Sequence, residues 1–172
     1  MYKQNLHTHT IFCDGKDTPE EMVQAAITKG FHSLGFSMHA YVPCSGIGSL
    51  ERLETYKREI LRLKALYADK IKIYLGLEYD IFASHGAEGY EYTIASVHCL
   101  RHNGEAFDFD GGLPKTRQVI ENYFGGDSVA FARRYYETVA SIPDHGKFDI
   151  LGHFDLITKN NETGNFLDVN DQ

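Results

Sequence analysis

The apolar positions of the chain predict strands alternating with helices. Apolar-rich stretches of six to eight residues are expected to be buried strands, and they occur at residues 2–7, 33–39, 71–78, 92–98 and 148–153. Between them, apolar residues recur every three or four positions, which is typical of helices with one buried face. Because helices separate the strands, the pattern predicts a single α/β domain built on a parallel sheet.

Capping residues set the expected helix boundaries. Thr18 and Glu21 form a capping box that begins a helix, and Gly30 ends it. Asp127 is a plausible N-cap for a later helix. The expected helices cover residues 19–29, 49–69, 115–124 and 128–142. Residues 103–112 are rich in Gly and Asp, and we predict no regular element there.

A residue that can bind a metal ion stands at or just after the end of each predicted strand. These residues are His7 and His9, His39, Glu78, His98 and His153, and Asp14 follows the first pair in a turn that Gly15 permits. The carboxyl ends of parallel strands share one rim, so these side chains should converge. Imidazole and carboxylate are ligands for zinc, iron or manganese. The alternative, histidines that only pack in a core, requires ligand-type residues at five strand ends by chance.

Composition limits the partners and the cellular location that we expect for this protein. The chain has 172 residues and a net charge of −7, which argues against a general nucleic-acid-binding protein. No apolar run reaches the ~18 residues of a membrane span, and the N-terminal residues do not resemble a signal peptide. The three cysteines show no CxxC spacing, which favours reduced thiols. We therefore expect a cytoplasmic protein with neither membrane nor nucleic-acid partners.

The ligand-bearing segments resemble the successive motifs of one family. HTHTIFCDG, the SMH that ends at His39, GLEYD around Glu78, ASVH that ends at His98 and LGHFDL around His153 look like those of the polymerase and histidinol phosphatase (PHP) superfamily. The resemblance covers almost the whole chain, and it is greatest to the monofunctional PHP-type histidinol-phosphatases. It implies a distorted (β/α)7 TIM-like barrel, of which about five βα units are present here.

The resemblance also implies a role for each ligand in a centre of three divalent metals (Zn, Mn or Fe). His7 and His9 would bind the first metal, and Glu78 would bridge the first and second. The remaining ligands would be His98 and His153 at the second metal, and Asp14 and His39 at the third. Closely spaced metals lower the pKa of water and neutralise phosphoryl oxygens. The implied enzyme is a phosphoric monoester hydrolase acting on L-histidinol phosphate in histidine biosynthesis, with Glu78 and His153 as catalytic residues.

The sequence departs from the family pattern after His153, where the family has a late Asp-x-His motif. Asp168-Val169-Asn170 lies in that region but contains no histidine. We therefore expect residues 1–172 to be a single PHP domain that lacks the C-terminal strands, with weakened activity and a tendency to associate. Two alternatives stay open. One is a PHP phosphoesterase acting on nucleotides or nucleic-acid ends, and the other is an inactive metal-binding fragment.

Overall fold

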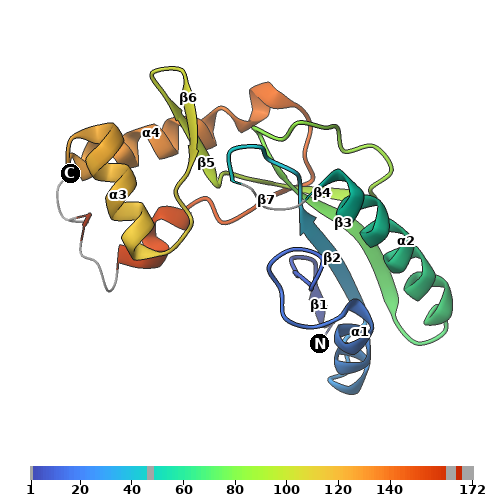
Figure 1. Ribbon diagram of the computed structural model, residues 1–172. Helices are drawn as coiled ribbons and strands as arrows, with labels where there is room; N and C mark the ends of the chain where they lie inside the picture. Colours follow the sequence, from blue (N-terminus) through green and yellow to red (C-terminus); the bar gives the residue numbers. More distant parts are fainter. Residues whose placement is uncertain (1, 46–48, 162–165, 168–172) are drawn as a thin grey trace.

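A computed structural model describes residues 2–45, 49–161 and 166–167. The elements, shown in Figure 1, are β1 (Gln4–Asn5), α1 (Pro19–Thr28), β2 (Ser33–His39), α2 (Leu50–Leu66), β3 (Lys72–Asp80), β4 (Tyr92–Ser96), β5 (Cys99–His102), β6 (Glu105–Asp108), α3 (Leu113–Phe124), α4 (Ser128–Ala140), the 3-10 helix η1 (Ile142–His145), β7 (Ile150–Leu151) and the 3-10 helix η2 (Leu156–Asn160). Among the described residues, no helix combines the length and apolar character needed to cross a bilayer. The Asp168-Val169-Asn170 segment lies outside the described residues.

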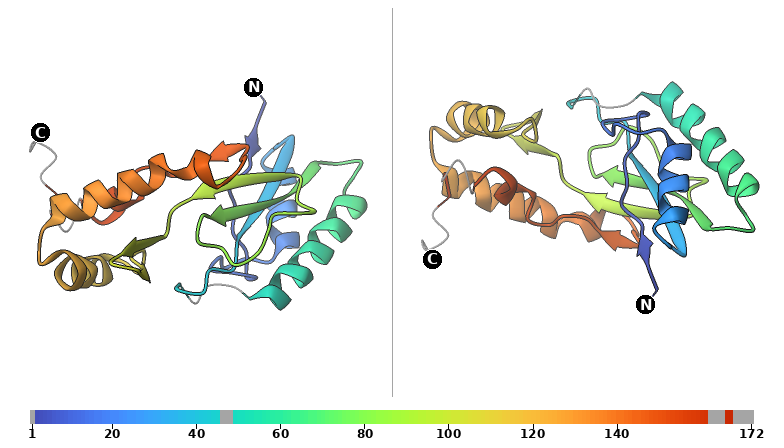
Figure 2. Two further views of the ribbon diagram at one scale, coloured as in Figure 1. Left: turned by 90° about the horizontal axis from the view of Figure 1, so that it is seen from above. Right: turned by 90° about the horizontal axis from the view of Figure 1, so that it is seen from below.

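Five strands form one parallel sheet in the order β1-β2-β3-β4-β7. Strands that follow one another in this sheet are also neighbours in space, as in a barrel wall, and the sheet curls into part of a barrel. Helices α1 and α2 lie beside β1 to β3, whereas the β5–β6 hairpin and helices α3 and α4 extend away from them (Figure 2). The predicted α/β class and the incomplete barrel are confirmed.

The predicted caps form where the sequence places them. The Thr18 hydroxyl accepts a hydrogen bond from Glu21 N (3.3 Å), and the Glu21 carboxylate accepts one from Thr18 N (2.9 Å). Asp127 accepts from Ala130 N (2.9 Å) at the start of α4. These bonds satisfy amide groups that the first helical turn leaves unpaired.

The two edge strands are shorter than predicted. Strand β1 covers only Gln4–Asn5 and β7 only Ile150–Leu151, and within the described residues each has one sheet partner. The histidines near them therefore lie just beyond the strands. The first segment still runs alongside β2, since Thr8 N donates to Ser37 Oγ (3.1 Å) and Ser37 N donates to Thr8 O (3.0 Å).

The region without a predicted element contains a hairpin strand. Strand β6 (Glu105–Asp108) pairs antiparallel with β5 (Cys99–His102), and Asn103-Gly104 forms the turn. Both turn residues have positive φ, 49° for Asn103 and 87° for Gly104. Asn-Gly is the residue pair that most favours such a two-residue turn, so this dipeptide was the available signal.

One tyrosine ring joins four strands of the sheet. Tyr92 in β4 donates its hydroxyl hydrogen bond to Leu6 O (2.5 Å), just past β1, and lies 3.1 Å from Phe36 O in β2. The ring crosses β3 over Gly76 and β2 over Gly35, and a Cβ at either glycine would overlap it. Gly76 and Glu78 lie two residues apart on β3, so the ring occupies the sheet face on which Glu78 projects.

The buried apolar residues form two clusters. The first is built around β2, β3, α1 and α2, and includes Phe36, Tyr56 and Leu77. The second joins the end of β4 to the hairpin, α3 and α4, and includes Phe131 and Tyr135. The first cluster is drawn mainly from the earlier half of the chain and the second from the later half.

Candidate metal centre

Glu78 lies at the centre of a group of imidazole rings. Its side chain is fully buried. Five histidine nitrogens surround its carboxylate: His7 Nε2 (3.1 Å), His9 Nε2 (3.2 Å) and His39 Nδ1 (3.0 Å) around Oε2, and His98 Nε2 (3.4 Å) and His153 Nε2 (2.9 Å) around Oε1. The two carboxylate oxygens thus face two different sets of rings.

Asp14 stands at the outer side of this group, where its carboxylate is more than half exposed. Its Oδ1 lies 3.3 Å from His9 Nδ1 and its Oδ2 lies 3.5 Å from His39 Nε2. His39 therefore lies between the two carboxylates, with one ring nitrogen toward Glu78 and the other toward Asp14. The structure brings together all seven residues that the strand ends pointed to.

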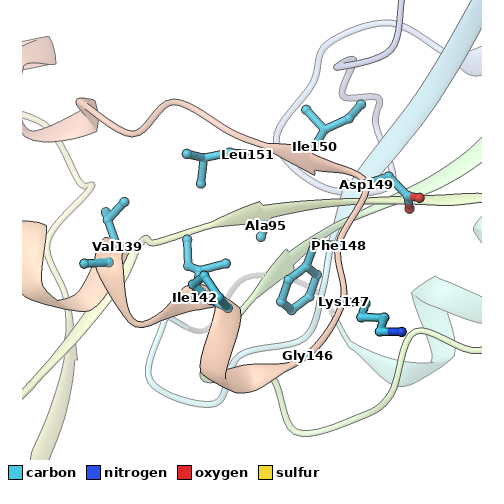
Figure 3. A pocket seen from close by; sticks show the side chains of 11 residues that line it. Ala95, Val139, Ile142, Gly146, Lys147, Phe148, Asp149, Ile150 and Leu151 are labelled. Atoms are coloured by element: carbon cyan, nitrogen blue, oxygen red, sulfur yellow. The ribbon is translucent and has the colours of Figure 1, made fainter.

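A separate apolar pocket lies at the β7 edge of the sheet (Figure 3). The side chains that line it include Ala95, Ile142, Phe148 and Leu151, and none of the seven predicted ligands is among its lining residues. Its chemistry differs from that of the histidine group, which is polar and converges on one buried carboxylate. The residues that could bind a metal therefore lie at the strand ends and not in this pocket.

The spacing of the ligand atoms fits divalent metal ions. For metal–ligand bonds of about 2.1 Å, two ligand atoms lie about 3.0 Å apart at right angles and about 3.4 Å apart at the tetrahedral angle. The contacts of Glu78 and Asp14 with histidine nitrogens span 2.9–3.5 Å. Glu78 Oε2 is buried and has three imidazole nitrogens within 3.2 Å, yet none of them is aligned to make a hydrogen bond. A buried acceptor without a hydrogen-bond donor is the arrangement expected of a metal ligand.

Within the described residues, three overlapping groups of side chains are compact enough to hold an ion. They are His7, His9 and Glu78; His9, Asp14 and His39; and His39, Glu78 and His98. His153 adds a further nitrogen on the Oε1 side of Glu78. The mixed nitrogen and oxygen donors suit zinc, manganese or iron.

The histidines of this group lower the pKa values of its two carboxylates. Burial alone would raise the pKa of Glu78, but the imidazoles of His153, His39, His7 and His9 hold this pKa far below its usual range. Contact with His39 likewise lowers the pKa of Asp14. Both carboxylates are therefore ionised at neutral pH.

The pKa values of two of the imidazoles shift in the opposite direction, upward. Burial lowers the pKa of His9, but contacts with Cys13 and Glu78 outweigh burial and raise it to about 10. The pKa of His98 also rises to about 10, because Asp80 and Glu78 outweigh its burial. The raised pKa values favour the protonated form of both rings in the metal-free protein, with the carboxylates as their counter-charges.

Asp80 is a residue of this site for which the sequence reasoning had assigned no role. It is 2% exposed. Its Oδ2 accepts a hydrogen bond from His98 N (2.7 Å) and lies 3.5 Å from His98 Nδ1, on the ring edge away from Glu78. Its position two residues after Glu78, on the same face of β3, was the available signal. A carboxylate behind a ligating imidazole fixes its orientation and raises its basicity.

We expect Asp80→Asn to weaken zinc binding by about 10- to 100-fold while the fold persists, because the ring of His98 loses this carboxylate. Zinc affinity is measured by competition with a chromophoric chelator. Asp149→Asn is a matched control: Asp149 also accepts a backbone hydrogen bond, from Thr93 N (2.8 Å), but contacts none of the seven residues. Equal losses in both variants would contradict the role of Asp80.

The family follows from comparison with known proteins. A model of the PHP domain matches residues 5–171. The chain belongs to the PHP domain family. This PHP domain is 34% identical over 170 residues to the histidinol-phosphatase of Lactococcus lactis subsp. lactis (strain IL1403), with 92% of this chain and 59% of the relative covered.

Two solved structures share the fold. A histidinol phosphatase candidate from Listeria monocytogenes superposes with a TM-score of 0.73 at 23% identity, covering 91% of this chain and 68% of that one. Histidinol phosphate phosphatase from Lactococcus lactis, solved in complex with zinc, L-histidinol and phosphate, gives a TM-score of 0.55 at 22% identity, with 92% of this chain and 59% of that one covered. The PHP domain described here spans about 60% of the length of the curated relatives that it matches.

Proposed function

We propose that this PHP domain catalyses metal-dependent hydrolysis of a phosphomonoester, with L-histidinol phosphate as substrate. The observation that carries the proposal is the convergence of five imidazoles on one buried carboxylate, with a second carboxylate beside them. Curated relatives named histidinol-phosphatase and a structural neighbour that holds zinc, L-histidinol and phosphate support the choice of substrate. This reaction would belong to histidine biosynthesis.

We propose three metal positions. His7, His9 and Glu78 Oε2 would hold the first, and Glu78 Oε1 with His98 and His153 would hold the second. Asp14 and His39 would hold the third. The contacts of Glu78 support the separation of the first and second positions, since His7 and His9 lie near Oε2 and His98 and His153 lie near Oε1. His39 lies between Oε2 and Asp14, beside both the first and the third proposed position.

When bound, such ions supply electrophilic stabilisation of phosphoryl oxygens and activate water. The protein side chains provide the framework for this chemistry. Glu78 and Asp14 contribute the negative charge that concentrates cations at the rim. Asp80 holds the ring of His98, and the burial of Glu78 keeps bulk water away from its carboxylate.

Phosphate release from L-histidinol phosphate by the purified 172-residue chain tests this proposal. Assays contain added manganese or zinc, and parallel samples contain a chelator. Chelator-sensitive release from L-histidinol phosphate in preference to nucleoside monophosphates supports the assignment. Preference for nucleotides would favour another PHP phosphoesterase. Metal binding without turnover of any of these esters would favour a domain that binds metal but does not catalyse.

Zinc binding should release protons at pH 7, because the raised pKa values of His9, His98 and His39 favour protonated rings, and a ring nitrogen must lose its proton to bind a cation. Isothermal titration calorimetry in buffers of different ionisation enthalpy measures the number released. Zinc affinity should fall as the pH is lowered. Release of no protons would contradict the pairing of these imidazoles with carboxylates.

The metal-free protein, kept in a chelator, should become less stable as the pH rises above 6.5. The pKa values of His9 and His98 rise from 6.5 to about 10 on folding. Their contribution to the free energy of unfolding is therefore complete below pH 6.5 and is lost as the pH approaches 10. The pKa of Glu78 falls from 4.5, so its contribution is present above pH 4.5 and is lost as the pH falls further. Melting temperatures measured in a chelator should therefore be highest between about pH 4.5 and 6.5.

A further inference from the structure

A pair of thiols lies beside the metal centre and has no part in it. Cys44 Sγ and Cys99 Sγ are 2.7 Å apart, although 55 residues separate them in the chain. Cys99 is buried at the start of β5, directly after His98, and Cys44 is half-buried in the turn that follows β2. Both are free thiols in this structure.

Backbone pairing and a hydrogen-bonded turn fix the positions of the two cysteines. Cys99 pairs with Asp108 in the β5–β6 hairpin, which fixes its backbone. The turn that carries Cys44 is closed by hydrogen bonds from Ser45 N (3.1 Å) and Ser45 Oγ (3.0 Å) to Val42 O. A disulfide has an S–S length of about 2.05 Å, so the sulfurs need to approach by only about 0.7 Å.

We propose that Cys44 and Cys99 form a reversible disulfide that ties the turn after β2 to the start of β5. Val42 and Ser45 of this turn line the same small cavity as Glu78, Asp80 and His98. The bond would therefore hold the turn against one side of the metal centre. This proposal does not depend on which ester the site hydrolyses.

The reaction requires a low-molecular-weight disulfide, such as oxidised glutathione, as the oxidant. Cys44, the more exposed thiol, attacks one glutathione sulfur and forms a mixed disulfide, releasing one glutathione thiolate. Cys99 then attacks the Cys44 sulfur and displaces the second glutathione thiolate. Two protein thiols are oxidised to one disulfide, one glutathione disulfide is reduced to two thiols, and the two protons of the cysteines pass to the glutathione sulfurs.

The test incubates the full chain with oxidised glutathione. The protein should lose two of its three thiols and about 2 Da in mass. Peptide mapping without reduction should recover the segment of Cys44 joined to that of Cys99. The oxidised protein should melt about 5 °C or more above the reduced one, because the bond closes a long loop, and dithiothreitol should reverse the shift.

Matched variants complete the test. Cys44→Ser and Cys99→Ser should each prevent the cross-link, whereas Cys13→Ser should leave it intact, since Cys13 Sγ lies instead beside His9 Nδ1 (3.4 Å). The proposal is overturned if the wild-type chain stops at a glutathione adduct, forms only bonds between chains, or melts at the same or a lower temperature after the cross-link forms. Peptide mapping of the wild-type protein gives this answer even if a serine variant does not fold.

Discussion

Glu78→Gln is expected to lower kcat for L-histidinol phosphate by at least about 10³-fold, or about 4 kcal/mol of transition-state stabilisation. The amide removes the one charge that faces five imidazoles, and it turns an acceptor oxygen into an NH2 donor among ring nitrogens. Two of the proposed metal positions lose a ligand at once. Phosphate release and metal content per chain, measured on the same preparations, check this expectation.

His145→Gln is the matched control for Glu78→Gln. His145 is an exposed histidine at the end of η1 and lies outside the group around Glu78. It should keep wild-type activity and metal content. Circular dichroism establishes that both variants are folded. Similar activity losses in the two variants, or a full metal complement in Glu78→Gln, would remove Glu78 from the centre of the site.

Gly76→Ala is expected to destabilise the protein by about 3 kcal/mol. Its new methyl group would overlap the ring of Tyr92, which cannot move away without losing its hydrogen bond to Leu6 O. Because the ring crosses the sheet from β4 to β1, strain at Gly76 reaches four strands. Urea denaturation of the chelated protein measures the free energy of unfolding.

Gly86→Ala is the matched control for Gly76→Ala. A methyl group at Gly86 would meet only the carboxylate end of Glu88, a flexible side chain. Its cost should stay below about 1 kcal/mol. Tyr92→Phe, which keeps the ring and removes its hydroxyl, should cost about 1–2 kcal/mol. If Gly76→Ala cost no more than Gly86→Ala, the ring would not be packed against the glycine.

The site was predictable because parallel strands impose their own geometry. Residues as distant as His7 and His153 meet because their strands end at one rim, so a pattern of strand ends was enough to group them. The pattern did not require the strands to be long, since His98 and His153 each lie two residues beyond a strand. Asp80 was not predicted from the strand ends, because Glu78 already supplied the ligand of β3, and only the contacts of Asp80 with His98 give it a role.

Other features depend on tertiary contacts that a sequence pattern does not express. The lengths of β1 and β7 are set by how far each pairs with its neighbour, Gln4–Asn5 with β2 and Ile150–Leu151 with β4. The β5 and β6 strands have only four residues each, too short for a clear alternating pattern, so the Asn103-Gly104 turn is the main sequence signal of the hairpin. The closeness of Cys44 and Cys99 depends on how two loops pack at the rim, and neither sequence spacing nor composition indicates it.

The division of the histidines between the two parts of the chain has a thermodynamic consequence. His7, His9 and His39 come from the part of the chain that builds the first cluster, and His98 and His153 from the part that builds the second. Ions bound by both sets, as proposed above, would stabilise the protein only when both clusters are folded and in contact. The two halves are candidate cooperative units in their own right. Bound metal would then couple the unfolding of the two halves. The protein should unfold in one cooperative transition with metal and in two separate transitions without it.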